Sequence, residues 1–120
     1  MRKLFRKLSI TISAITMVGV IGFSASVVAS SDLEAGKKLA FDKKKGNCLA
    51  CHLITGGEMA GNIAPPLIAM KARFPDVKVL RAQIADARIK NPASFMPPFA
   101  PHGILTSGEI DKITAFVHSL

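Results

Sequence analysis

The sequence predicts a small all-α domain with long loops, and three features support this fold class. Apolar residues recur at helical spacing in several stretches, whereas no stretch alternates apolar and polar residues as a half-buried strand does. Glycine and proline pairs at residues 56–57 and 65–66 interrupt the middle of the chain. The chain has 120 residues, which leaves one small domain after its unusual N-terminal stretch. So small a core needs reinforcement from inside the fold.

The N-terminal stretch is typical of an export signal. Four basic residues precede an uncharged run from Leu8 to Ala29 that ends in small residues. We therefore predict a signal peptide over residues 1–29, cleaved after Ala29, and one periplasmic domain over residues 30–120. An uncleaved membrane anchor is the alternative, because an uncharged run of this length can span a bilayer. The Ser, Thr and Gly residues within the run favour cleavage, which would leave no stable membrane insertion.

Capping residues predict the first half of the domain. Ser31 and Glu34 fit a capping box that begins a helix ending at Phe41, before a charged turn. A short helical turn is expected over residues 47–53, and a loop without apolar periodicity follows as far as residue 66.

The second half is predicted to hold the remaining helices, over residues 67–73, 77–89 and from the cap at Thr106 to Leu120. Prolines limit the first two of these helices, because proline removes a backbone donor and clashes with the preceding turn. Thr106 and Glu109 fit a second capping box, ahead of apolar residues at helical spacing.

The most informative run of the sequence reads Cys-Leu-Ala-Cys-His. Residues three and four apart lie on one side of a helical turn, so Cys48 and Cys51 can bond two vinyl groups while His52 presents its imidazole to iron. A thioredoxin-like thiol pair, a zinc site and a disulfide are the alternatives. No βαβ pattern surrounds the pair, and His102 and His118 lack paired ligand spacing. One covalently bound haem c is therefore the predicted cofactor.

A second axial ligand must come from elsewhere in the chain, and Met96 is the preferred residue. It lies in the run Phe-Met-Pro-Pro-Phe, where prolines restrict the backbone and leave few amide donors. Met70 has core spacing and Met59 lies in a glycine-rich loop, so packing or surface roles are favoured for both. His102, which precedes a glycine, is the main rival, and His118 is expected to be exposed.

Charge does not indicate a nucleic-acid ligand. The net charge is +8, but four of the cations belong to the predicted leader, so the domain itself is only mildly basic. No Trp or Tyr interleaves the basic residues. Lys43, Lys44 and Lys45 form a solvated loop or a surface that steers an acidic partner, and both interpretations stay open.

Three segments resemble the SoxX family, the monohaem cytochrome subunits of SoxAX complexes in bacterial thiosulfate oxidation. The segments read AFDKKKGNCLACH, GNIAPPLIAMKARFPD and NPASFMPPFAPHGILTSGEIDKITAFVHSL. The resemblance implies a class I cytochrome c-like fold, with helices and loops wrapped around one haem, and His/Met ligation of its iron. It also implies that the Pro65 carbonyl accepts the Nδ1 proton of His52, that Leu67 packs on the ring, and that the outer helices cross near Gly36 and Phe116. Ala stands where the class usually has Gly before that proline.

The same resemblance implies a function as part of an L-cysteine S-thiosulfotransferase. A SoxA-like haem subunit would join thiosulfate to a SoxYZ-like sulfur carrier, and this chain would pass the electrons to a small soluble cytochrome. No nucleophile with an adjacent base is found here, so the chain would lack a bond-forming active site of its own. A free periplasmic shuttle cytochrome is the alternative. A peroxidase would need an open iron site, against which Met96 argues.

Overall fold

The computed structural model describes residues 25–120, with side-chain environments from residue 30 onward. The predicted leader lies mostly outside these residues, so its cleavage stays a prediction. Within them the elements are α1 Ala25–Phe41, η1 Cys48–Ala50, α2 Met70–Arg73, α3 Val77–Ala85, η2 Ala87–Ile89 and α4 Ser107–His118. The described part of the chain has no strand, and the predicted all-α class is confirmed. In the same part, every helix is too short or too polar to cross a membrane.

Helix α1 begins earlier than the sequence predicted. It starts at Ala25 and passes through Ser31, so the capping box expected at Ser31 and Glu34 does not begin a helix. A cap requires non-helical backbone at its first residue, whereas the small and aliphatic residues before Ser31 continue the helix without interruption. The predicted cleavage position after Ala29 therefore lies within α1.

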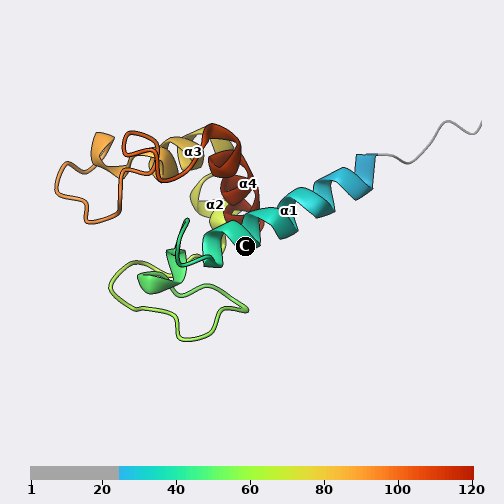
Figure 1. Ribbon diagram of the computed structural model, residues 1–120, viewed down its shortest axis with the longest axis horizontal. Helices are drawn as coiled ribbons and strands as arrows, with labels where there is room; N and C mark the ends of the chain where they lie inside the picture. Colours follow the sequence, from blue (N-terminus) through green and yellow to red (C-terminus); the bar gives the residue numbers. More distant parts are fainter. Residues whose placement is uncertain (1–24) are drawn as a thin grey trace, which may run out of the picture.

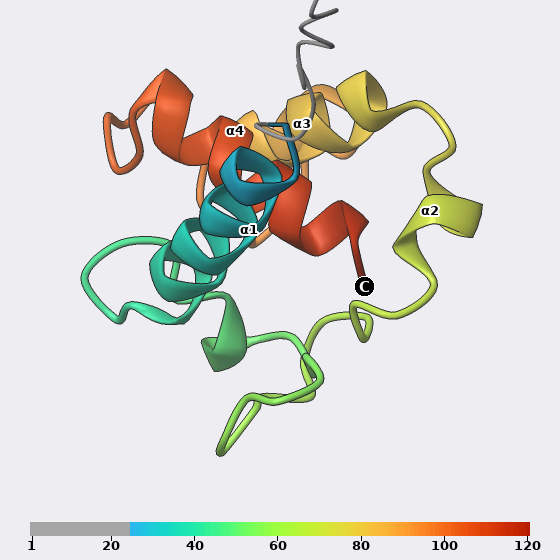
Figure 2. The same ribbon diagram turned by 90° about the vertical axis from the view of Figure 1, so that its right-hand side faces the viewer.

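Helices α1 and α4 cross at close range, as Figures 1 and 2 both show. A Cβ placed on Gly36 would overlap the Lys112 carbonyl oxygen and lie 2.9 Å from Cβ of Phe116. Phe41 and Phe116 pack edge to face in the same interface, with ring centroids 5.9 Å apart. The crossing near Gly36 and Phe116 that the resemblance implied is therefore present, and it requires a residue without a side chain.

Helix α3 is shorter than predicted, because Asp86 ends it. Asp86 adopts extended backbone, and its carboxylate accepts a hydrogen bond from the Arg88 amide at 3.1 Å, which begins η2. Aspartate often competes with helical hydrogen bonding in this way. Helix α2 likewise starts only at Met70, since Ala69 has left-handed backbone with φ of 50°. The predicted helix 67–73 is thus shortened to its last four residues, and the predicted helix 77–89 is divided at Asp86.

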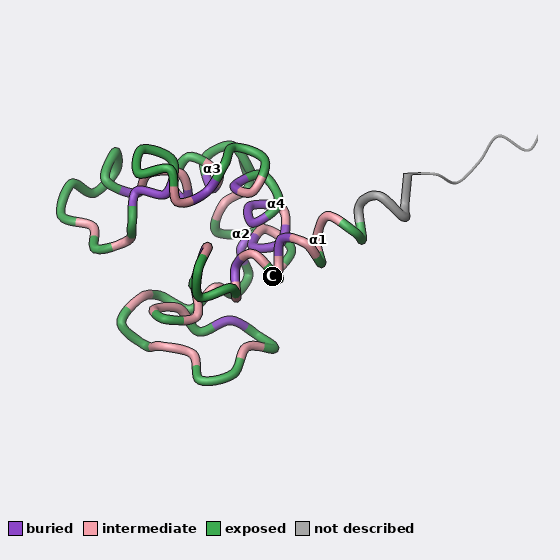
Figure 3. Tube along the Cα trace, in the orientation of Figure 1, coloured by how far each residue is buried: buried purple, intermediate pink, exposed green. Residues whose placement is uncertain are grey.

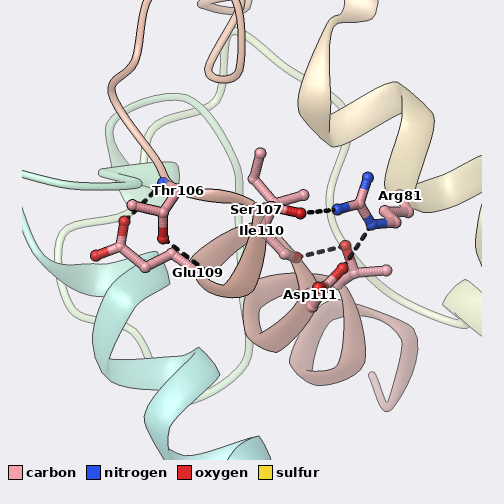
Figure 4. Close-up of polar contacts among 7 residues, drawn as sticks. Arg81, Thr106, Ser107, Glu109, Ile110 and Asp111 are labelled. Atoms are coloured by element: carbon pink, nitrogen blue, oxygen red, sulfur yellow. Dashed lines mark hydrogen bonds and ion pairs between the residues drawn. The ribbon is translucent and has the colours of Figure 1, made fainter.

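The N-terminus of α4 links three parts of the chain (Figure 4). The predicted capping box is confirmed, since the Thr106 amide donates to Glu109 at 2.8 Å and the Glu109 amide donates back at 3.3 Å. Lys45 forms an ion pair with Glu109 at 2.7 Å, and this contact, together with the Thr106 amide, holds the pKa of Glu109 below its usual value. Arg81 of α3 hydrogen-bonds Asp111 at 2.5 Å and Ser107 at 2.8 Å.

The buried core lies among the helices, and two long loops leave it on one side (Figures 1 and 3). The most deeply buried large side chains are Ile54, Met70, Ile110 and Ile113. The loop that contains residues 47–69 and the loop that contains residues 90–106 are mostly exposed or half-buried. These loops therefore have little buried apolar area of their own to hold them in place.

Replacing Gly36 by alanine should destabilise the fold by about 1–3 kcal/mol, because the new methyl group meets rigid backbone of α4. The shift in the urea midpoint of unfolding, at constant slope, measures this loss. Gly108→Ala is the matched control, since a Cβ at Gly108 has no neighbour within 4 Å. Equal stability of the two variants would contradict the proposed steric limit.

Candidate haem-binding site

A cavity of about 850 Å³ opens between the two long loops. Its walls come from residues 47–52, residues 63–74, the inner side of α3, residues 91–99 and two apolar residues of α4. This volume is within the range of small-molecule sites. The lining is mainly apolar, and its polar side chains are few: Asn47, His52, Arg73, Gln83, Asn91 and Ser94. The cavity is therefore shaped and lined for a large apolar group with some polar substituents.

All six residues predicted to serve the haem line this one cavity: Cys48, Cys51, His52, Pro65, Leu67 and Met96. Three of the alternative ligands, Met59, His102 and His118, do not line the cavity. His118 instead hydrogen-bonds the Phe74 carbonyl at 3.0 Å and is half-buried, so its expected exposure is wrong. Met70 is the one alternative ligand that reaches the cavity wall.

A tight turn places the two cysteines at the cavity. The Gly46 amide donates to the Leu39 carbonyl at 3.0 Å, and a Cβ on Gly46 would lie 2.9 Å from that oxygen and 3.3 Å from Cys48 Sγ. Asn47 then takes left-handed backbone with φ of 46° and leads into η1. The His52 amide closes the turn on the Cys48 carbonyl at 2.9 Å. Both thiols and the imidazole are thereby presented by a single turn.

Both cysteines are free thiols, and both line the cavity. Burial raises the pKa of the Cys48 thiol from its ordinary 9.0 to about 11. A neutral thiol suits an apolar wall, whereas a thiolate there would need a cation. Within residues 25–120, no three His, Cys, Asp or Glu side chains gather as a possible ion site, so the zinc alternative has no ligand set in that part.

A hydrogen bond fixes the tautomer of His52. Its Nδ1 lies 2.7 Å from the Pro65 carbonyl oxygen. A carbonyl can only accept, so Nδ1 carries the proton and Nε2 keeps its lone pair free for a metal. The contact that the resemblance implied is present, although the usual glycine before Pro65 is Ala64 here.

The segment before and after Pro65 is tied to the haem-attachment turn by backbone hydrogen bonds that the sequence did not reveal. Three amides donate across: Gly61 to Leu49 at 2.7 Å, Ala64 to Cys51 at 3.1 Å and Leu67 to Leu53 at 2.9 Å. A Cβ on Gly61 would overlap the Ala50 carbonyl, which explains the glycine at that point. No apolar alternation marks this pairing, since it is too short to form a strand.

The two methionines of the cavity differ in their surroundings. Met70 is 2% exposed, belongs to the core, and its sulfur accepts a hydrogen bond from Arg73 at 3.4 Å. Met96 is half-buried and is held on a loop, where its amide donates to Ser94 Oγ at 3.2 Å. Phe99, which is 4% exposed, anchors the same loop in the core. Met96 therefore lines the cavity from a loop, whereas Met70 lines it from within the packed core.

The donor set fits covalently attached haem. Two thiols and an imidazole share one turn, the Met96 thioether residue lines the same cavity, and the rest of the wall is largely apolar. A haem seated here would also cover Ile63 and Phe95, which line the cavity and are otherwise exposed. Burying these side chains against an apolar ring would supply the reinforcement that the small core requires.

Comparisons with known proteins agree with this fit. The cytochrome c family model matches residues 33–120. A chain of the crystal structure of SoxXA from P. pantotrophus is similar over 72% of this chain and 79% of that chain, with 28% identity and a TM-score of 0.65. The predicted resemblance to SoxX is thus confirmed. An uncharacterized lipoprotein of Aquifex aeolicus (strain VF5) is 40% identical over 76 residues, which are 62% of this chain and 37% of that protein. This chain therefore spans little more than a third of that relative.

In chain produced without haem attachment and shown by circular dichroism to retain its helices, Cys48 should react with iodoacetamide about a hundredfold more slowly at pH 8 than in the urea-unfolded chain. The reason is that a thiol with a pKa of about 11 rather than 9.0 holds that much less thiolate. Mass spectrometry of the modified peptide gives the rate. The rate should rise with pH up to about 11, and a plateau near pH 9 would contradict the assigned burial.

Proposed function

The chain belongs to the cytochrome c family, and from this premise we propose that it is a periplasmic monohaem electron-transfer subunit of the SoxX kind. One observation supports the proposal above all: Met96, which is distant in sequence, lines the same cavity as the attachment motif of Cys48, Cys51 and His52. The family's cofactor is covalently bound haem c, and the attachment motif is complete at the cavity wall.

Each of these residues has a separate role in the proposed site. Cys48 and Cys51 would attach the haem through their thiols, and His52 would bind the iron through Nε2 because the Pro65 carbonyl accepts its Nδ1 proton. Met96 would bind the iron through its sulfur, and Leu67 would pack against the ring. Haem bound in this way supplies one-electron redox chemistry.

Ligation by Met96 favours electron transfer over catalysis at the iron. A thioether stabilises the ferrous state, and a filled sixth position excludes small ligands such as peroxide. No further thiol remains in the sequence to hold sulfur once both cysteines are bonded. The chain would therefore carry electrons for bond-forming chemistry that takes place on another subunit.

The proposed partner is a SoxA-like haem subunit, because the similar solved chain belongs to a SoxXA structure. In this proposal the pair releases electrons when thiosulfate is joined to a cysteine of a SoxYZ-like carrier, and a small soluble cytochrome accepts them. The uncharged N-terminal run supports export to the periplasm, with removal of residues 1–29.

A docking role for the lysine run is limited by the structure. Lys45 is already paired with Glu109, which leaves Lys43 and Lys44 as the exposed cations of that run. Exposed charges of this kind affect the rate of association more than the affinity. Any steering of an acidic partner from this turn would therefore depend on these two residues.

In haem-loaded protein, Met96→Ala should abolish the weak red-edge absorption that a sulfur to iron bond gives in the ferric state. Met70→Ala should keep this absorption, because its sulfur is engaged in the core. Cyanide should bind the ferric Met96→Ala protein readily and the parent protein slowly, since only the variant has an open sixth position. Persistence of the band in Met96→Ala would refute the assigned ligand.

Tagged full-length chain, purified from thiosulfate-grown cells of its source, should retain a second haem-bearing subunit. Reduction of the complex on addition of thiosulfate and the sulfur carrier would support the proposed role. A control purification of Met96→Ala tests whether the second subunit stays bound when the sixth ligand is lost. A monodisperse monomer that exchanges electrons with an oxidase and ignores thiosulfate would instead identify a free shuttle cytochrome.

A further inference from the structure

Two consecutive prolines, Pro65 and Pro66, follow each other where the chain leaves the cavity wall, which Pro65 lines. Proline has no backbone N–H, so Pro65 and Pro66 cannot be held by donating hydrogen bonds. They can be fixed only through their carbonyl groups or their rings. The Pro65 carbonyl is the acceptor for His52 Nδ1 at 2.7 Å, and its direction decides how the imidazole is oriented. The peptide unit that follows contains the Leu67 amide, which donates to the Leu53 carbonyl at 2.9 Å, and the Pro66 carbonyl, which is the second group through which that unit can be held.

Arg73 contacts the Pro66 carbonyl. Its Nη1 donates to the Pro66 carbonyl at 2.8 Å and to the Met70 sulfur at 3.4 Å, and the residue itself lines the cavity. Met70 is buried in the core and is fixed further by a hydrogen bond from its amide to the Leu120 carbonyl at 2.9 Å. The guanidinium thus connects the exposed proline segment to a rigid part of the fold.

We propose that Arg73 is a positioning residue for the axial histidine: it holds the Pro66 carbonyl so that the Pro65 carbonyl stays directed at His52 Nδ1. This inference rests on the proposed haem ligation by His52. Neither the position of Arg73 on a short helix nor its charge predicted this role from the sequence.

The geometry of proline transmits this constraint. The Pro65 carbonyl belongs to the planar peptide unit that joins Pro65 to Pro66. The ring of Pro66 locks its φ angle, which leaves only one soft torsion between the two carbonyl groups. Fixing the Pro66 carbonyl therefore limits the plane that contains the Pro65 carbonyl to rotation about that one torsion. The Ala64 amide, which donates to Cys51, restrains the segment before Pro65. The Leu67 amide, which donates to Leu53, belongs to the same peptide unit as the Pro66 carbonyl, so Arg73 adds a second restraint to that unit.

The consequence concerns the strength of the hydrogen bond on Nδ1. A well-aligned acceptor orients the imidazole and raises its basicity towards a metal, and such outer partners tune metal sites. Without Arg73 the proline peptide would rotate more freely, and the Nδ1 proton would spend more time open to solvent. Exchange of that proton with water thus reports directly on whether Arg73 holds the Pro66 carbonyl.

The test compares Arg73→Met with Lys71→Met in ferrous, haem-loaded protein. Both variants remove one cation from α2 and introduce the same side chain, but only Arg73 contacts Pro66 and lines the cavity. Exchange of the His52 Nδ1 proton, followed by NMR, should be about tenfold faster in Arg73→Met, the effect of losing one hydrogen bond. In Lys71→Met it should stay at the parent rate.

Two further measurements separate loss of the Arg73 contact from general unfolding. The core amides of Ile113 and Val117 in α4 should exchange at the parent rate in every variant, which distinguishes local release from general unfolding. Arg73→Lys should recover part of the protection, because an ammonium can donate to the Pro66 carbonyl. Parent-like exchange in both Arg73→Met and Arg73→Lys overturns the proposal. Absence of covalent haem from the parent protein would instead refute the proposed function itself.

Discussion

The hydrogen bond from His52 Nδ1 to the Pro65 carbonyl is the interaction on which the site depends. It joins the turn that carries the cysteines to the loop that closes one wall of the cavity. Because a carbonyl can only accept, the bond also fixes which imidazole nitrogen is available to a metal. A single 2.7 Å contact therefore determines both the shape of the wall and the chemistry of the ligand.

The helices serve mainly as a platform for this arrangement. The close crossing at Gly36 brings α1 against α4, and the Phe41 and Phe116 rings complete that interface. Helix α1 ends directly before the turn that carries Cys48, while α4 contributes Ile113 and other apolar residues to the cavity wall. Packing between two helices that are distant in sequence thus sets the position of the attachment turn relative to the cavity.

Short spacings predicted some local features and misplaced others, while the distant contacts at Pro65 and Gly36 were expected only from the family resemblance. The capping box at Thr106 and the attachment motif follow from short spacings, and both have the expected local structure. The box at Ser31 has the same spacing but lies within a helix, since helix-compatible residues precede it. The break at Asp86 depends on a local side-chain hydrogen bond that competes with the helix only when tertiary packing permits it. The hydrogen bond from Arg73 to the Pro66 carbonyl joins residues seven positions apart, and no sequence pattern predicts it.

The loops and the helices differ in how much of their side-chain surface is buried, and therefore in how well they resist local opening. The loops that carry His52 and Met96 have few buried side chains of their own, and their backbone is restrained by prolines, turns and a few cross-segment amides. Such segments have little apolar area with which to resist local opening. A large apolar group held between them would give both loops a common surface to pack on. The same cavity that selects the cofactor would therefore make the fold's least buried segments depend on it, so that cofactor binding and loop order become one property.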